Sequence, residues 1–200
     1  CRNKALKAAV EKPENVKLFL NVDGNIIQDK AFIQGFTNRR AMKAGVPASD
    51  IVFEITERSD IENYQILQQI MKHYADQGYE IALDDVGAGH LGLNRVVNTT
   101  PDYLKADIEL VRDIHKYKKK EIMMKLLLDY CNATGAILIA EGIETVQELE
   151  CLHSLGVHYG QGFFLGKPER AFGNISAESE EILERLNGRK NILFLDISGK

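Results

Sequence analysis

The sequence contains few of the features that would place it in the secretory pathway or in a membrane. Only three of its 200 residues are cysteine, and no two of them form a C-x-x-C pair. Such a sparse, odd set predicts reduced thiols, which are typical of the cytosol. No apolar run approaches the ~20 residues that a bilayer span needs, and the first residues do not resemble a signal peptide. We therefore expect a cytoplasmic protein without direct membrane insertion.

Positive charge is also scarce. Lysine and arginine number 25 against 29 aspartates and glutamates, which gives a net charge of −4. Proteins that bind a DNA or RNA polymer usually carry the opposite excess, so we expect no nucleic-acid polymer as a partner. The basic cluster Lys116–Lys120 is typical of a solvent-exposed helix face. With 44% hydrophobic residues, the composition predicts a globular protein with one sizeable core.

Short apolar runs alternate with helix-period segments along most of the chain. Strand-like runs, rich in branched and aromatic residues, lie at 16–22, 51–56, 80–84, 102–107, 136–140 and 158–164. The clearest helical segments lie at 60–77, 118–133 and 145–155. Gly78, Gly135 and Gly156 stand where the C-terminal caps of these helices belong, and we expect Met123 and Met124 to lie in the core. The alternation predicts βαβ units and a parallel sheet that helices cover.

The pattern changes after Pro168. Residues 177–187 have the pattern of a charged amphipathic helix, and residues 191–196 form an isolated strand candidate. We therefore expect one domain at residues 1–170. Residues 171–200 would hold a linker helix and a C-terminal strand or the start of a following segment.

Each predicted strand carries a polar side chain at or near its carboxyl end. These residues are Asn21, Glu54 with Glu57, Asp84 with Asp85, Lys105 with Asp107, Glu141 with Glu144, and Gln161. In an open doubly wound sheet they would spread along an edge more than ~20 Å long, because neighbouring strands lie about 4.8 Å apart. In a barrel they would form a ring around one mouth, where βα-barrel enzymes place their chemistry. We therefore predict an α/β fold of the TIM-like (β/α) barrel type, with six of its eight strands in this chain.

Such a ring of carboxylates calls for a cation. Converging carboxylates repel one another, and oxygen ligands without a His or Cys cluster suit hard ions such as Mg²⁺ or Mn²⁺. Asp84 at a strand end can lie between two ions while Asp85 turns to the second, and Gly87 and Gly89 let the backbone approach a ligand. Lys105 would contact an attacking water or a phosphate oxygen. The ring thus predicts phosphodiester hydrolysis at a two-metal site.

Other interpretations of single residues stay open. One strand-end acid by itself is more often a solvated or helix-capping carboxylate, and Glu144 before Thr145 fits a helix N-terminus. Gln161, which lies between glycines, fits a residue that satisfies loop backbone. A different metal-dependent barrel enzyme, one that abstracts a proton next to a carboxylate, is a further alternative that Asn21 and the adjacent aspartates fit poorly.

Six stretches on the six predicted strands resemble the EAL domain family. They are Leu20–Val22, Phe53–Glu57, Leu83–Gly87, Tyr103–Asp107, Ala140–Glu144 and Tyr159–Phe164, followed by Gly166–Pro168. The resemblance covers about residues 1–170. It implies an EAL-type barrel and, in bacterial signalling, metal-dependent hydrolysis of cyclic di-GMP to linear pGpG.

The resemblance also implies roles for the matching residues. The implied metal ligands are Asn21, Glu54 and Asp84 for the first metal, and Asp84 with Asp85 for the second. The implied catalytic residues are Lys105, Glu141 and Glu144. The implied substrate contacts are Gln161, Gly87 and Pro168. Lys105 would hold the hydrolytic water, Glu141 would act through the second metal or as a base, and Glu144 would anchor the loop at 86–93.

Three features depart from the family pattern. The Glu-Ala-Leu motif and the strand before it are absent, so we expect an N-terminally truncated sequence that hydrolyses poorly by itself. The loop at 86–92 reads VGAGHLG, where the family usually has Phe, Thr and Tyr-Ser-Ser, and Asp23 stands where Ser is usual. These departures support an alternative, a catalytically inactive EAL-type domain that binds cyclic di-GMP or a partner as a regulatory module. The resemblance further implies additional domains in the parent protein and a homodimer formed through the helix after the glycine loop.

Overall fold

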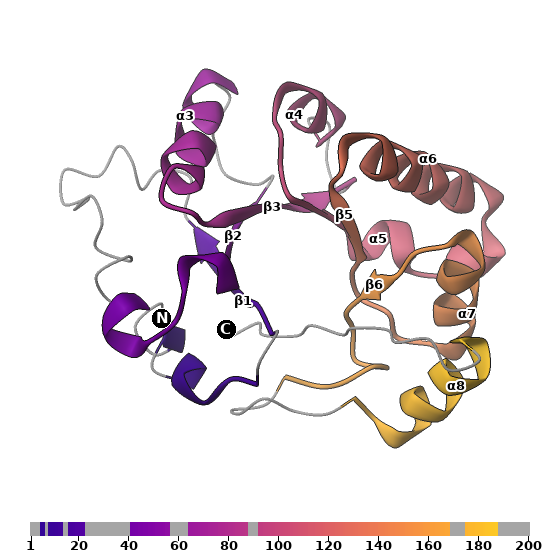
Figure 1. Ribbon diagram of the computed structural model, residues 1–200. Helices are drawn as coiled ribbons and strands as arrows, with labels where there is room; N and C mark the ends of the chain where they lie inside the picture. The colour runs from indigo at the N-terminus through magenta and orange to yellow at the C-terminus, as the bar shows by residue number, and fades with distance from the viewer. Residues whose placement is uncertain are drawn as a thin grey trace.

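A curved parallel sheet with helices along its outer face organises the chain, as Figure 1 shows. The computed structural model describes residues 5–6, 8–13, 16–22, 41–56, 64–87, 92–168 and 175–187. None of the helices in these ranges is long and apolar enough to cross a bilayer.

Strand and helix alternate from the second strand to the sixth, as the sequence predicts. The strands are β1 (Leu18–Val22), β2 (Ile51–Thr56), β3 (Glu80–Val86), β4 (Tyr103–Ala106), β5 (Ile137–Ala140) and β6 (Tyr159–Gly160). The α-helices are α3 (Tyr64–Ala75), α4 (Gly92–Asn98), α5 (Ile108–Val111), α6 (Lys118–Thr134), α7 (Val146–Leu155) and α8 (Ala177–Asn187). Short 3₁₀ helices are η1 (Ala9–Glu11), η3 (Ala48–Asp50) and η4 (Ile114–Lys116).

The order of the strands distinguishes a barrel from a doubly wound sheet. All five pairs are parallel, and the strands follow one another in chain order from β1 to β6. Because parallel crossovers are nearly always right-handed, an unbroken order keeps every connecting helix on the same face. A doubly wound sheet instead reverses its order at a switch point and carries helices on both faces. The sheet is therefore a six-stranded part of a barrel.

The sixth strand is shorter than the sequence suggests. We predict a strand over 158–164, but β6 comprises only Tyr159 and Gly160, which pair with Ile139 and Ala140. The chain then turns, because the carbonyl of Gly162 accepts hydrogen bonds from the N–H groups of Leu165 and Gly166 at 3.0 Å. The apolar residues after Gln161 belong to this turn and not to the sheet.

The main core lies between the outer face of the sheet and the helices. Residues such as Phe53, Leu104 and Met124 are fully buried there. The prediction that Met123 also lies in the core is wrong, since its exposed fraction is 37%. Consecutive helix residues point about 100° apart, so burying Met124 turns Met123 toward solvent. The predicted C-terminal caps are confirmed at Gly135 and Gly156, which end α6 and α7 in the left-handed region.

A second, smaller cluster lines the inner face of the sheet. It consists of Phe19, Val52, Ala82, Tyr103 and Ile139, with Ile137 and Tyr159 packed against it. Toward the amino ends of the strands lies what we term the amino-end pair, an ion pair between Lys17 and Glu80. The hydroxyl of Tyr103 donates a hydrogen bond to Glu80 Oε2 at 2.8 Å, which connects this pair to the inner cluster.

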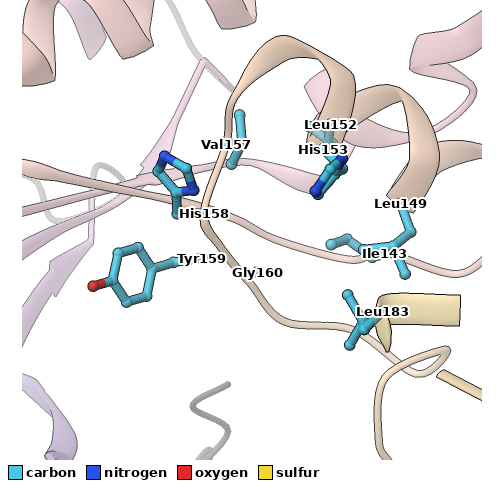
Figure 2. Close-up of a pocket in the computed structure, with 9 residues that line it drawn as sticks. All are labelled: Ile143, Leu149, Leu152, His153, Val157, His158, Tyr159, Gly160 and Leu183. Carbon is cyan, nitrogen blue, oxygen red and sulfur yellow. The ribbon is translucent and has the colours of Figure 1, made fainter. Parts of the chain in front are cut away.

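Helix α8 packs against α7 beside the last strand. Leu183 is buried there, and Arg185 forms an ion pair with Glu150 at 2.5 Å. Figure 2 shows the small pocket between these helices and β6, lined by Ile143, Leu149, Leu152, His153, Val157, His158, Tyr159, Gly160 and Leu183. In this view Tyr159 lies on the opposite side of the ribbon from Ile143 and Leu183. The strand β6 thus separates an apolar outer side from the inner face. The strand that we predict at 191–196 lies outside the described residues.

Candidate active site

The polar residues at the strand ends continue the inner face of the sheet. Side chains of a strand alternate between its two faces, so residues two positions apart share a face. Two positions beyond Phe19, Val52, Ala82, Tyr103, Ile139 and Tyr159 stand Asn21, Glu54, Asp84, Lys105, Glu141 and Gln161. Each of these six polar residues therefore follows an inward-facing apolar residue. This period of two is the physical reason why the polar side chains gather at the carboxyl end of the inner face.

Lys105 lies at the centre of this group. Its Nζ atom is 2.5 Å from Glu54 Oε1, 3.0 Å from Asp84 Oδ1 and 2.6 Å from Glu141 Oε1. Only 5% of the lysine side chain is exposed. Burial by itself would lower the pKa of Lys105, but the attraction of the three carboxylates outweighs it and raises the pKa above its ordinary value. The ammonium therefore stays charged although it is buried.

Glu141 follows β5 and is held from two sides. Its backbone N–H donates to the carbonyl of Ala106 at 3.0 Å, and Gln161 Nε2 donates to its Oε1 at 2.5 Å. Burial raises the pKa of Glu141 to about 8, with a further contribution from the charges of Asp84 and Glu54, while Lys105 acts in the opposite direction. The sheet thus holds this carboxyl group where its negative charge is unfavourable even beside the ammonium of Lys105.

A bulge in β3 explains why two adjacent aspartates share one site. Leu83 is opposite Leu104 and Val86 is opposite Ala106, so β3 uses one more residue than β4 over this stretch. Asp85 takes a φ of +59°, a left-handed conformation that Asp tolerates better than most residues. In a regular strand the two side chains would point to opposite faces. Instead, ligand oxygens of Asp84, Asp85 and Glu141 all lie within 4.8 Å of one another.

The donor set fits a hard divalent cation. Among the described residues, the carboxylates of Glu54, Asp84 and Glu141 contact the single ammonium of Lys105, and the carboxylate of Asp85 lies beside those of Asp84 and Glu141. Their charge is not balanced by this lysine alone, and every donor is an oxygen, the ligand type that Mg²⁺, Mn²⁺ and Ca²⁺ prefer. We refer to these five residues as the carboxyl-end cluster.

The turn that carries Glu141 is closely packed. Gly142 has a φ of +70°, and a Cβ atom there would lie 2.2 Å from Cγ1 of Ile108. The N–H of Ile143 donates to the carbonyl of Gln161 at 3.0 Å. The helix α7 that follows starts at a capping box formed by Thr145 and Glu148. Glu148 is not among the residues predicted from the sequence, although the T-x-x-E spacing before an apolar helix is a readable signal.

Of the remaining predicted residues, Asn21 and Gly87 lie at this end of the sheet. Asn21 is exposed and pairs in register with Glu54, which places both on the same face. Gly87 follows the bulge with a φ of +104°. Glu144 and Pro168 are exposed and do not belong to the carboxyl-end cluster. The loop that Glu144 is expected to anchor includes residues 88–91, among them His90, which lie outside the described residues. Asp23 and Glu57 lie outside the described residues as well.

Known proteins with similar sequences share one domain. The EAL domain model matches residues 2–168 of this chain. The cyclic di-GMP phosphodiesterase PdeB of Shewanella oneidensis is 25% identical over 150 residues, which make up 75% of this chain and 17% of that protein. The chain therefore spans less than a fifth of the length of this curated relative.

Solved structures of similar proteins contain the same barrel. The calcium and cyclic di-GMP complex of BlrP1 from Klebsiella pneumoniae has a TM-score of 0.80 at 29% identity, covering 87% of this chain and 45% of that one. The cyclic di-GMP-bound standalone EAL protein of Vibrio cholerae has a TM-score of 0.79 at 27% identity, covering 90% and 76%. The strand order and the TIM-like barrel agree with these structures, and the EAL domain model matches residues 2–168. The chain therefore belongs to the EAL domain family.

Proposed function

We propose that this chain is the catalytic part of a cytoplasmic, metal-dependent phosphodiesterase that hydrolyses cyclic di-GMP to linear pGpG. The observation that carries the proposal is the carboxyl-end cluster, in which three carboxylates contact one buried lysine and a fourth, that of Asp85, lies close to two of them. Membership of the EAL family supports it, because the relative PdeB is a cyclic di-GMP phosphodiesterase. The parent protein would carry additional domains.

In this proposal the cluster and the neighbouring Asn21 would hold two Mg²⁺ or Mn²⁺ ions. Asn21, Glu54 and Asp84 would bind the first, and Asp84 with Asp85 would bind the second. The closeness of the Asp84, Asp85 and Glu141 oxygens and the excess of negative charge support this assignment. Bound divalent ions would supply an activated water molecule and stabilise negative charge on the phosphodiester oxygens.

Lys105 then acts on the reacting groups directly. Its ammonium contacts three carboxylates, and one of its three N–H bonds would turn from a carboxylate to the attacking water and hold it. The water oxygen forms a new bond to phosphorus, and the bond from phosphorus to the ribose 3′ oxygen breaks. One water proton goes to a carboxylate, for which Glu141 is our candidate, and the leaving 3′ oxygen takes up a proton from the solvent, so that the two proton transfers balance. The product is the linear dinucleotide with one 5′ phosphate.

Three residues complete the proposed substrate wall and one anchors its loop. Gln161, Gly87 and Pro168 contact the substrate, and Glu144 anchors the loop at 86–93. The hydrogen bond from Gln161 to Glu141 supports the role of Gln161, because it connects the substrate wall to the cluster. The positive φ of Gly87 supports the role of Gly87, since it lets the backbone approach a ligand closely.

The test is the formation of pGpG from cyclic di-GMP in Mn²⁺, followed by chromatography. We expect turnover by the parent protein and slower turnover by the 200-residue chain, which lacks the Glu-Ala-Leu motif. Lys105→Met and Asp84→Asn should abolish pGpG formation, whereas Glu150→Gln, which removes an exposed carboxylate of α7, should not. Turnover that survives Asp84→Asn would contradict the proposed site.

A second candidate function is a regulatory module that binds cyclic di-GMP without hydrolysing it. The altered loop at 86–92 and Asp23 favour this alternative, because both stand near the expected mouth. Calorimetric titration separates the two functions. Binding of cyclic di-GMP by the parent protein, together with no pGpG after long incubation in Mn²⁺, would establish the module and exclude the enzyme.

We also propose that two copies pair through the exposed face of α6 and the neighbouring α4. Ile122 and Leu126 are 53% and 57% exposed one turn apart, and Val97 of α4 is 72% exposed. The two helices touch, because the Tyr130 hydroxyl donates to the carbonyl of Val96 at 2.9 Å.

The charges of α6 favour a second copy as the occupant of this face. In an antiparallel pair centred on residue 124, Ile122 would oppose Leu126 and Lys119 would oppose Asp129 of the other copy. Sedimentation should show a dimer that Leu126→Lys separates and Val10→Lys, at another exposed apolar position, leaves intact. A monomeric wild-type chain at micromolar concentration would overturn this assignment.

A further inference from the structure

Glu148 is a buried carboxylate that lies outside the carboxyl-end cluster. It belongs to α7, and only 3% of the residue is exposed. Its Oε1 accepts a hydrogen bond from the backbone N–H of Asp113 at 2.8 Å. Its Oε2 accepts from the N–H groups of Glu144 and Thr145 at 2.9 and 3.0 Å. One side chain therefore satisfies three backbone donors from two separate loops.

This arrangement exceeds what a helix cap requires. In a capping box the carboxylate bonds only to the N-cap residue, here Thr145. The bonds to Asp113 and Glu144 are additional. Asp113 has a φ of +57°, a left-handed conformation at the point where the chain turns from α5 into η4. Glu148 thus joins this turn to the turn after β5.

The turn after β5 determines where the carboxyl group of Glu141 points. Between Glu141 and the bond at Glu144 lie only Gly142 and Ile143. Ile143 N–H is bonded to the carbonyl of Gln161, whose side chain in turn donates to Glu141. Fixing the backbone at Glu144 therefore limits the torsions that remain to Glu141, because both ends of this short segment are held.

We propose that Glu148 is a positioning residue for the cation site. By holding the turn at Glu144 against Asp113, it sets the Glu141 carboxylate beside Lys105 and Asp84 and so sets the affinity for a divalent ion. This proposal rests on the proposed function, in which Glu141 acts at the metal. A carboxylate suits this position because it only accepts hydrogen bonds, whereas a glutamine would direct its NH₂ group at one of the backbone donors.

The test compares Glu148→Gln with two control variants. Glu150→Gln removes the same charge from the same helix but affects an exposed pair with Arg185. Thr145→Val removes the side-chain cap of α7 and leaves the Glu148 carboxylate in place. We expect Glu148→Gln alone to weaken Mn²⁺ binding about tenfold in calorimetry, as outer groups that orient metal ligands typically do. Amide hydrogen exchange at Asp113, Ile143 and Glu144 should accelerate in the same variant.

Each outcome bears on the proposal. Faster exchange with unchanged Mn²⁺ affinity would mean that Glu148 orders the two loops without affecting the cation site. Equal weakening of Mn²⁺ binding by Thr145→Val would mean that Glu148 acts only by stabilising the start of α7. Either result overturns the proposal without affecting the proposed function. A wild-type chain that does not bind Mn²⁺ would overturn both, and the exchange data would then report whether Glu148 orders the turn. If Glu148→Gln does not fold, Glu148→Asp, which keeps the charge but cannot span both loops, should weaken Mn²⁺ binding in its place.

Discussion

The two ends of the sheet's inner face differ in the balance between positive and negative side chains. At the amino end, the Lys17 and Glu80 side chains form a one-to-one ion pair, and each is 30% exposed. At the carboxyl end, Lys105 is 5% exposed and contacts three carboxylates, with a fourth, Asp85, nearby. Both groups extend the same inner apolar cluster along its strands, so the sheet offers both ends the same framework.

The difference indicates which end is built for a ligand. A balanced pair at the surface needs nothing more, and such pairs contribute little to stability. A buried cluster with excess negative charge is costly unless a cation joins it. The similar structure of BlrP1 is a complex with calcium and cyclic di-GMP. The two ends therefore differ in charge balance, and not in the mere presence of acidic residues, and on this difference we base the proposal that the carboxyl end binds the ligand.

The largest expected effect comes from removing each lysine in turn. Lys105→Met should lower the free energy of unfolding by about 3 to 5 kcal/mol in metal-free buffer, because it leaves buried carboxylates without their cation. Lys17→Met should cost less than about 1 kcal/mol. Urea unfolding in a chelator measures both. Equal losses would show that the two ends do not differ in the way the charges suggest.

Glycines at the two ends provide a second contrast. A Cβ atom at Gly162, at the carboxyl end, would lie 2.2 Å from the backbone of Ile143, whereas at Gly135, before β5, it would meet nothing within 4 Å. Gly162→Ala should therefore destabilise the fold by about 2 to 3 kcal/mol through overpacking. Gly135→Ala should cost about 1 kcal/mol, since only its left-handed φ is unfavourable. Thermal unfolding of the two variants tests this order, and a larger loss for Gly135→Ala would reverse it.

Substitutions at the two ends should affect the affinity of the protein for divalent ions differently. Asp84→Asn should weaken Mn²⁺ binding at least about tenfold, because it removes an oxygen donor shared by the cluster. Glu80→Gln, the matched change at the amino end, should leave Mn²⁺ affinity unchanged. Calorimetric titration of both variants provides the comparison. If Glu80→Gln weakened binding as strongly, the cation would not be specific to the carboxyl end.

The smallest expected effect is a pH dependence that originates beneath the carboxyl end. Burial alone would raise the pKa of Glu148, but hydrogen bonds from the N–H groups of Asp113 and Glu144 and from Thr145 outweigh it and lower the pKa. A lowered folded pKa means that the ionised carboxylate stabilises the fold above its unfolded pKa of about 4.3. This contribution disappears as the pH falls through the folded pKa.

Unfolding free energies of wild type and Glu148→Gln measured across acidic pH test this expectation. The two should differ by about 1 kcal/mol near pH 6, the usual value of a helix cap, and converge in strong acid. Glu150→Gln serves as the control, because its carboxylate lies in an exposed pair. A difference that grows toward low pH would contradict the lowered pKa.

Some of the site was readable from the sequence because it depends on local periodicity. Glu54 and Lys105 stand two positions after apolar residues in strand-like runs, and the unbroken alternation with helices predicts a barrel. Other features depend on partners far along the chain. The length of β6 depends on pairing with β5, and the bulge at Asp85 depends on the register with β4.

The sequence by itself determined which residues face inward and which motifs they form, because side-chain alternation and turn preferences are properties of neighbouring residues. The tertiary structure alone decided that a bulge turns Asp84 and Asp85 to the same side, that Met123 is exposed, and that Glu148 joins two loops. Each of these outcomes depends on contacts between segments that lie far apart along the chain. Such contacts form only when the sheet curves and its crossovers close over it.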